Sequence, residues 1–146
     1  MHKALNYMSL ARRGGRIELG EEPCGAAARA GHAKLIVVAA DASPHTWRRA
    51  KSYTAGTDQQ CVRVPFSKDE LGEAIGRTSL AMAAFTDPAL ALAFMKALDG
   101  QEQYREILEN LEQKTKRVRQ RQDEVKAHQR NVRMGKVRKA PGPKKD

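Results

Sequence analysis

A short apolar segment followed at once by polar groups is the part of the sequence most suggestive of chemistry. Residues 33–49 read AKLIVVAADASPHTWRR, so that Asp41, Ser43 and Pro44 come directly after the apolar run LIVVA. A carboxylate at the carboxyl end of a buried strand is a common place for catalytic and nucleotide-binding groups in α/β proteins. The same place also suits a side chain that caps a helix by accepting its free backbone N–H groups.

The partners that catalysis requires are missing around Asp41. Phosphatases with an Asp-x-Asp pair need a second carboxylate where Ser43 stands, and the sequence has neither a GxGxxG segment nor a Walker A motif. The histidines (His2, His32, His45 and His128) show no spacing typical of a zinc site. Cys61 and His45 can meet only through the fold, and a lone cysteine on a strand is more often part of a core. We therefore predict no catalytic residue, metal or cofactor, and interpret Asp41 and Ser43 as capping groups for the following helix.

Length and composition are typical of one domain with an appendage. The chain has 146 residues, and no apolar run approaches the roughly 20 residues that cross a bilayer. The N-terminal segment has no long apolar stretch, so we expect no signal peptide and no membrane association. Cys24 and Cys61 are too few for a disulfide framework, which favours reduced thiols and a cytoplasmic location.

Positive charge is concentrated at the end of the chain. Residues 1–113 contain fourteen Lys/Arg and fourteen Asp/Glu, whereas residues 114–146 contain thirteen Lys/Arg and three Asp/Glu. The whole net charge of +10 therefore belongs to the last part of the sequence. A neutral body with a basic tail indicates a polyanionic partner, most often a nucleic acid, although a tail that only improves solubility is the alternative.

Hydrophobic patterns predict alternating helices and strands up to about residue 100. Good capping sequences begin three of the helices: Ser43-Pro44, the capping box Ser67–Glu70, and Asp87-Pro88. The expected helices cover 2–13, 20–31, 44–55, 68–75 and 88–98, and the expected strands cover 16–19, 35–39, 61–66 and 79–85. This alternation predicts an α/β domain with helices on both faces of a sheet.

The sequence from residue 101 onward predicts a long charged helix. It has no Gly or Pro up to residue 130, and its first part carries an apolar stripe that can pack on the domain: Tyr104, Ile107, Leu108 and Leu111. Val118, Val125 and Val132 recur at sevenfold spacing, which is too thin a seam for a coiled coil without a partner. We predict an α/β domain over 1–100, a helical extension over 101–134, and a disordered basic tail over 135–146.

Three segments in this order resemble a known family. GHAKLIVVAADASPHT, VPFSKDELGEAIGR and MAAFTDPALA are similar to the kink-turn-binding ribosomal protein superfamily, the "L-seven-Ae" family, and in particular to its small bacterial members. The resemblance covers residues 3–98. It implies a three-layer α/β/α sandwich with a four-stranded mixed sheet, and RNA binding without catalysis.

The resemblance also implies where RNA would bind. Better-known members use a Gly-x-Asn-Glu-x-x-Lys pattern at the start of a helix, which falls here on residues 20–26. Gly20 is kept, but Glu22, Pro23 and Ala26 replace the Asn, Glu and Lys of the pattern. These replacements remove an amide that both donates and accepts and a cation that binds phosphate. A carboxylate there is compatible with RNA where it accepts from guanine or cytosine amino groups.

Two hypotheses follow for function. The first is a structured-RNA-binding protein, associated with ribosomal RNA or a kink-turn, with no small-molecule substrate. Its predicted RNA-binding residues in the domain are Arg16, Gly20, Glu21, Glu22, Lys34, Arg77, Thr78 and Ser79, and those in the extension are Lys114, Lys116, Arg117, Arg119 and Arg121. The alternative is a protein-interaction module that has lost kink-turn recognition and binds ribosomal proteins or other proteins of the translation or transcription machinery.

Overall fold

Four short strands form one mixed sheet in the order β1-β4-β2-β3. The computed structural model describes residues 2–134, and the strands are β1 (Ile17–Leu19), β2 (Leu35–Val38), β3 (Cys61–Arg63) and β4 (Met82–Phe85). β4 runs antiparallel to both β1 and β2, with Leu19 opposite Ala83 and Val38 opposite Met82. β2 and β3 are parallel, and the helix between them makes the crossover that a parallel pair requires.

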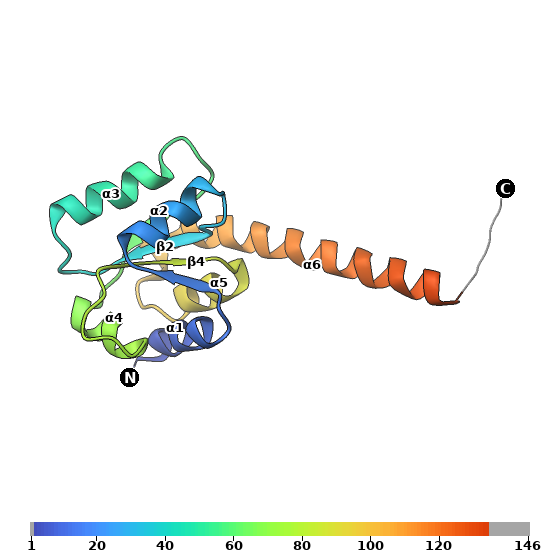
Figure 1. Cartoon of the computed structure of the whole chain (residues 1–146), viewed down its shortest axis with the longest axis horizontal. Helices are drawn as coiled ribbons and strands as arrows, with labels where there is room; N and C mark the ends of the chain where they lie inside the picture. The colour runs from blue at the N-terminus through green and yellow to red at the C-terminus, as the bar shows by residue number, and fades with distance from the viewer. Residues whose placement is uncertain (1, 135–146) are drawn as a thin grey trace. The chain divides into compact units, whose positions relative to one another are not determined.

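Helices cover both faces of this sheet (Figure 1). α2 (Glu21–Arg29) and α3 (Pro44–Thr54) lie on one face, and α1 (Lys3–Arg13), α4 (Lys68–Ala74) and α5 (Pro88–Lys96) lie on the other. Burial of β2 and β4 at every position agrees with two helical layers, because only a strand covered on both faces is apolar throughout. The predicted three-layer α/β/α sandwich with a four-stranded mixed sheet is confirmed.

The predicted helix starts are confirmed in atomic detail. The hydroxyl of Ser43 accepts from the Thr46 N–H at 3.2 Å, and the carboxylate of Asp87 accepts from the Ala89 N–H at 3.0 Å. Ser67 and Glu70 form the complete capping box at the start of α4. These side chains satisfy backbone donors that a helix cannot satisfy by itself, which is why the helices begin where the sequence predicts.

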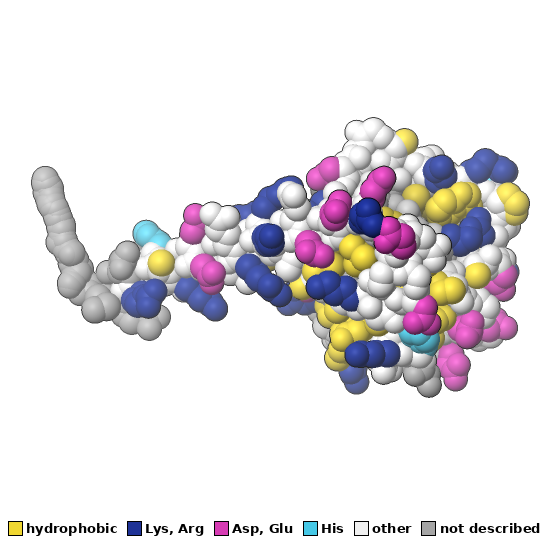
Figure 2. Space-filling view, turned by 180° about the vertical axis from the view of Figure 1, so that it is seen from behind, with side chains coloured by type: hydrophobic (Ala, Val, Ile, Leu, Met, Phe, Trp, Pro, Cys, Tyr) yellow, Lys and Arg dark blue, Asp and Glu magenta, His cyan; other side chains and the backbone are white. Residues whose placement is uncertain are grey.

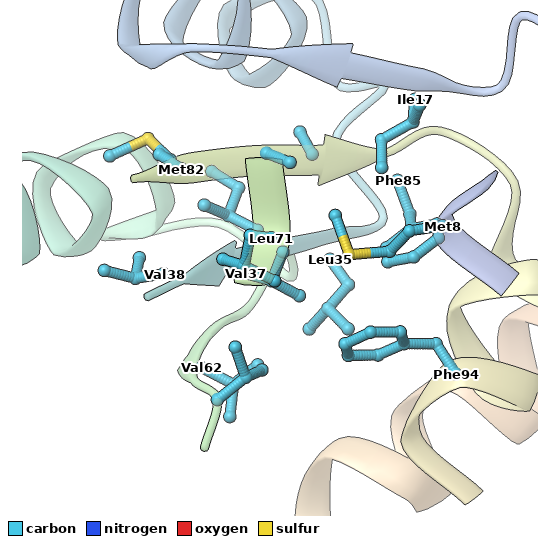
Figure 3. Close-up of a cluster of buried hydrophobic side chains, with 14 of the residues drawn as sticks. Met8, Ile17, Leu35, Val37, Val38, Val62, Leu71, Met82, Phe85 and Phe94 are labelled. Atoms are coloured by element: carbon cyan, nitrogen blue, oxygen red, sulfur yellow. The ribbon is translucent and has the colours of Figure 1, made fainter. Parts of the chain in front are cut away.

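The core lies on both faces of the sheet, and Figure 3 shows part of it. Met8 of α1, Leu35 of β2, Phe85 of β4 and Phe94 of α5 converge there and are fully buried. The rings of Phe85 and Phe94 lie 5.3 Å apart in a tilted arrangement. These contacts join α1 and α5 to the middle of the sheet, so the two central strands have little freedom to shift.

The charged C-terminal segment begins with a short 3-10 helix, η1 (Gln101–Tyr104), and continues as α6 (Arg105–Met134). Tyr104 and Leu111 are buried in the core cluster, and Ile107 and Leu108 pack against it, as the apolar stripe predicts. The chain divides into two compact units, Met1–Glu112 and Gln113–Asp146, so the first unit extends twelve residues beyond the expected boundary at residue 100. We call residues 1–112 the body. The basic tail predicted over 135–146 lies outside the described residues.

None of the helices within residues 2–134 is both long and apolar enough to cross a membrane.

The packing of the central strand predicts a clear difference between two identical substitutions. Leu35→Ala removes a fully buried side chain and is expected to lower the free energy of unfolding by about 3 kcal/mol. Leu10→Ala removes a side chain that is 45% exposed and is expected to change it by less than about 0.5 kcal/mol. Chemical denaturation followed by circular dichroism measures both values, and equal losses would contradict this description of the core.

Candidate functional site

Loops from distant parts of the sequence meet at the edge of the sheet where β1 and β2 end. The Gly20 N–H donates to the Met82 carbonyl at 2.9 Å, and the Ala39 N–H donates to the Ala81 carbonyl at 3.0 Å. The turn before α2, the turn after β2 and the loop before β4 therefore lie together. We call this region the carboxyl edge and define it as residues 20–22, 40–43 and 76–81.

Gly20 gives α2 a start that other residues tolerate poorly. Its φ of +99° lies in the left-handed region, where a side chain is strained, and it caps the helix without any side-chain hydrogen bond. The Gly20 carbonyl accepts from the Cys24 N–H at 3.1 Å, so the turn passes directly into the helix. This geometry accounts for glycine at the first position of the predicted RNA-binding pattern.

Gly72 positions the predicted loop Arg77–Ser79. A Cβ atom at Gly72 would lie 2.7 Å from the Ser79 nitrogen and 2.8 Å from the Arg77 carbonyl oxygen, and both are backbone atoms that cannot turn away. The Arg77 N–H donates to the Gly72 carbonyl at 2.8 Å. Gly72 was not among the predicted site residues, although a glycine inside a predicted helix is a signal for close backbone approach.

The same loop leaves its side chains to solvent. Arg77, Thr78 and Ser79 are all exposed, while their backbone is held against α4. The loop thus presents one cation and two hydroxyls, which suit phosphate and sugar oxygens.

Asp41 is a capping residue, but not for the helix that the sequence predicts. Its Oδ1 accepts from the Lys68 N–H at 2.8 Å, so it caps α4 rather than α3. The prediction is correct for Ser43 and wrong for Asp41, because the fold brings the start of α4 beside the turn after β2. The Leu80 N–H donates to the Lys68 carbonyl at 2.9 Å, which connects this cap to the loop before β4.

The two glutamates at the start of α2 have different surroundings. Glu21 directs both carboxylate oxygens to α3: Oε1 lies 3.1 Å from Nη1 of Arg49, and Oε2 accepts from the Thr46 hydroxyl at 2.9 Å. Glu22 is exposed at the carboxyl edge. Of these two predicted RNA-binding residues, Glu22 is the one whose carboxylate faces solvent.

Arg16 and Lys34 lie at the opposite edge of the sheet from Gly20. Their backbone groups form hydrogen bonds at the C-terminal end of β4. The Thr86 N–H donates to the Arg16 carbonyl, and the Lys34 N–H donates to the Phe85 carbonyl. The Arg16 guanidinium also pairs with Asp87 at 3.0 Å. The structure therefore does not bring these two predicted cations together with the carboxyl edge.

In the second unit, four of the five predicted cations are exposed on α6. These are Lys116, Arg117, Arg119 and Arg121, whereas Lys114 is buried. The valine at position 118 is half-buried and that at 125 is 53% exposed.

The structure places Cys61 and His45 at opposite ends of α3. Thr54 at the end of α3 has its hydroxyl 3.7 Å from the Cys61 sulfur, while His45 lies nine residues earlier, about 13 Å along the helix axis. Burial, with a smaller contribution from the nearby charges of Glu18 and Glu21, raises the pKa of Cys24 to about 12. Within residues 2–134 no three His, Cys, Asp or Glu side chains are grouped as a metal site requires.

The fold and the carboxyl edge define a small α/β/α sandwich domain that presents polar loops at one end of its sheet. The chain belongs to the ribosomal protein L7Ae/L30e/S12e/Gadd45 family, whose model matches residues 2–91. The resemblance found in the sequence is thereby confirmed.

Individual relatives extend this comparison. The RNA-binding protein YlxQ of Enterococcus faecium is 36% identical over 75 residues, which cover 51% of this chain and 72% of that protein. A Bacillus halodurans C protein of unknown function has a similar structure, with a TM-score of 0.63 and 23% identity over 68% of this chain and 99% of its own. The Giardia lamblia 15.5kD RNA binding protein has a TM-score of 0.55 and 22% identity over 64% of this chain and 79% of its own. The two structural similarities support the fold.

The close approach at Gly72 gives a prediction with a matched control. Gly72→Ala places a methyl group against the loop backbone and is expected to lower the free energy of unfolding by about 1–3 kcal/mol. Gly14→Ala makes the same chemical change at φ −87°, with its nearest neighbour at an ordinary 3.5 Å, and is expected to change stability by less than about 0.5 kcal/mol. Amide NMR shifts of residues 77–80 are expected to move only in Gly72→Ala. Equal stability of the two variants would contradict the positioning role of Gly72.

The raised pKa of Cys24 gives a prediction about its reactivity. At pH 8 a thiol with a pKa of about 12 is ionised in about one molecule in ten thousand, and only the thiolate reacts with iodoacetamide. Burial also raises the pKa of Cys61, but this side chain is partly exposed, so Cys61 is expected to be alkylated first. Mass spectrometry of peptides measures both rates in the native chain and in guanidinium, where the two rates are expected to become similar. Native Cys24 reacting as fast as Cys61 would contradict its placement in the core.

Proposed function

We propose that the chain is a non-enzymatic RNA-binding protein in which the body recognises the shape of a folded RNA and α6 binds phosphates by charge. Membership of the family and the similarity to a protein named as RNA-binding support this proposal. Folded RNA is read largely by shape, with hydrogen bonds to exposed base edges supplying selectivity. A kink-turn or a comparable element of ribosomal RNA is the structured target that we propose.

The observation that carries the proposal is the meeting of two loops at the carboxyl edge. The hydrogen bond from Gly20 to Met82 fixes the start of α2 beside the loop that contains Arg77. Glu22 can then accept from amino groups of guanine or cytosine, while Arg77 binds phosphate and the hydroxyls of Thr78 and Ser79 bond to sugar or phosphate oxygens. The family's Asn and Lys are absent, so this recognition uses a carboxylate where relatives use an amide.

The exposed cations of α6 supply the affinity that the carboxyl edge lacks. Arg117 and Arg121 share one face of the helix and Arg119 lies on another, so the cations are not confined to one stripe and follow charge rather than a base sequence. The proposed setting is the cytoplasm, in association with the ribosome or the proteins of translation.

Binding of two RNAs over a series of salt concentrations tests whether the body supplies selectivity and α6 supplies affinity by charge. The full chain is titrated with a kink-turn RNA and with a straight duplex of equal length, using fluorescently labelled RNA. Arg117→Gln, Arg119→Gln and Arg121→Gln together are expected to weaken binding to both RNAs equally and to reduce the slope of log K against log salt by up to about 3. Arg77→Gln is expected to reduce the preference for the kink-turn, with a change in slope of about 1.

The matched control removes three exposed charges elsewhere: Lys3→Gln, Arg29→Gln and Lys96→Gln. It is expected to leave both the affinity and the slope nearly unchanged. If the full chain binds heparin as tightly as either RNA, the proposal fails, and a protein-interaction module whose exposed Glu22 faces a basic partner takes its place.

A further inference from the structure

α3 has two flanks with different neighbours. On one flank, Arg49 pairs with Glu21 of α2, and the ring of Tyr53 lies so close to Gly25 that a Cβ atom there would be 2.8 Å from Cζ. On the other flank, Trp47 lies beside Arg63 of the edge strand β3. The first flank is used for packing between helices, whereas the second is at the border of the sheet.

Trp47 holds two cations in place on this second flank. The guanidinium carbon of Arg63 lies 5.0 Å from the centre of the Trp47 ring, and the ammonium of Lys51 lies 5.9 Å from it. Arg63 is fixed further because its Nη1 donates to the Ala40 carbonyl at 3.2 Å. A guanidinium carries five N–H donors, so these contacts orient Arg63 and leave donors for a ligand.

The acids that adjoin these cations from neighbouring elements already have partners, since Glu21 pairs with Arg49 and Asp41 caps α4. Neither α3 nor β3 contains an acidic residue, and Asp58 is the single Asp or Glu between residues 42 and 68. Arg48, which lies about one helical turn before Lys51 in α3, is also exposed. Figure 2 shows dark blue side chains around a hydrophobic patch in the region of α3. Cations on two elements that supply no acid of their own attract a polyanion rather than a mixed protein surface.

We propose that Trp47, Arg48, Lys51 and Arg63, here called the Trp47 platform, bind the sugar–phosphate backbone of the same RNA at a second position on the body. This inference rests on the proposed function. Because Arg63 bonds to the turn after β2, the platform adjoins the carboxyl edge, and one RNA strand can continue from the edge onto the platform. Trp47 is half-buried and acts as a support for the cations. Cations that are already oriented lose less side-chain entropy on binding than free ones.

The chain offers a direct probe of this surface, because Trp47 is its only tryptophan. Titration of the full chain with unlabelled kink-turn RNA is expected to change the Trp47 emission. The change is expected to saturate and to give the same Kd as the titration of labelled RNA. Arg48→Gln, Lys51→Gln and Arg63→Gln together are expected to weaken binding about tenfold more than Lys3→Gln, Arg29→Gln and Lys96→Gln, and to lower the salt slope by up to about 3. Trp47→Leu is expected to weaken binding by releasing the cations, whereas Trp47→Phe keeps a ring beneath them and stays within about twofold of wild type.

The outcomes separate this inference from the proposed function. Tight RNA binding with unchanged Trp47 emission, and equal affinities of the two triple variants, would overturn the Trp47 platform alone. A wild-type chain that binds no RNA would overturn both proposals. If polyglutamate changes the Trp47 emission at lower concentrations than RNA does, the platform fits an acidic protein and the inference fails. Circular dichroism of each variant shows whether a loss of binding reflects a loss of fold.

Discussion

The antiparallel placement of β4 between β1 and β2 determines where the loops of the candidate site lie. β4 pairs with β2 over Met82–Phe85 and with β1 over Ala83–Phe85, so its first residue lies where β1 and β2 end. A parallel central strand would place the loop containing Arg77 at the opposite edge, beside Arg16 and Lys34. The small residues Ala83 and Ala84 are fully buried in this strand, and they allow helices to approach the sheet closely on both faces.

The loop before β4 is then held by its backbone alone. Gly72 lets the chain fold back onto α4, and the Leu80 N–H bonds to Lys68, whose own N–H is capped by Asp41. These contacts connect the turn after β2, the start of α4 and the loop, and they need only Asp41 and Gly72 as specific residues because the other groups belong to the main chain. The side chains of residues 77–79 take no part in holding the loop and can therefore be used for binding.

Local features of this fold could be predicted from the sequence, whereas pairings between distant elements could not. The caps at Ser43, Ser67 and Asp87 are encoded within a few residues of each helix start, so they were predicted correctly. Asp41 caps a helix 27 residues away, and its partner depends on how the layers pack. The sequence places Arg16 and Lys34 at the start of their strands, but whether those strand ends lie beside the loop before β4 depends on the direction of β4, which no local pattern encodes.

The placement of charge on the body also depends on how its elements pack, and the sequence alone does not show it. Its cations and acids nearly cancel in the sequence, yet α3 carries Arg48, Arg49 and Lys51 without an acid, while α4 carries Asp69, Glu70 and Glu73. α3 and α4 lie on opposite faces of the sheet (Figure 1). A body without net charge thus has helices of opposite charge at its surface, and such local charge orients a charged partner during approach. In the proposed complex, phosphate is attracted to the cations of α3 and repelled by the carboxylates of α4, which favours contact through the Trp47 platform over contact through α4. This contrast is local to α3 and α4, because the cations of α1 offset the acids of α4 within the same layer, and a sum over a layer or over the sequence conceals it.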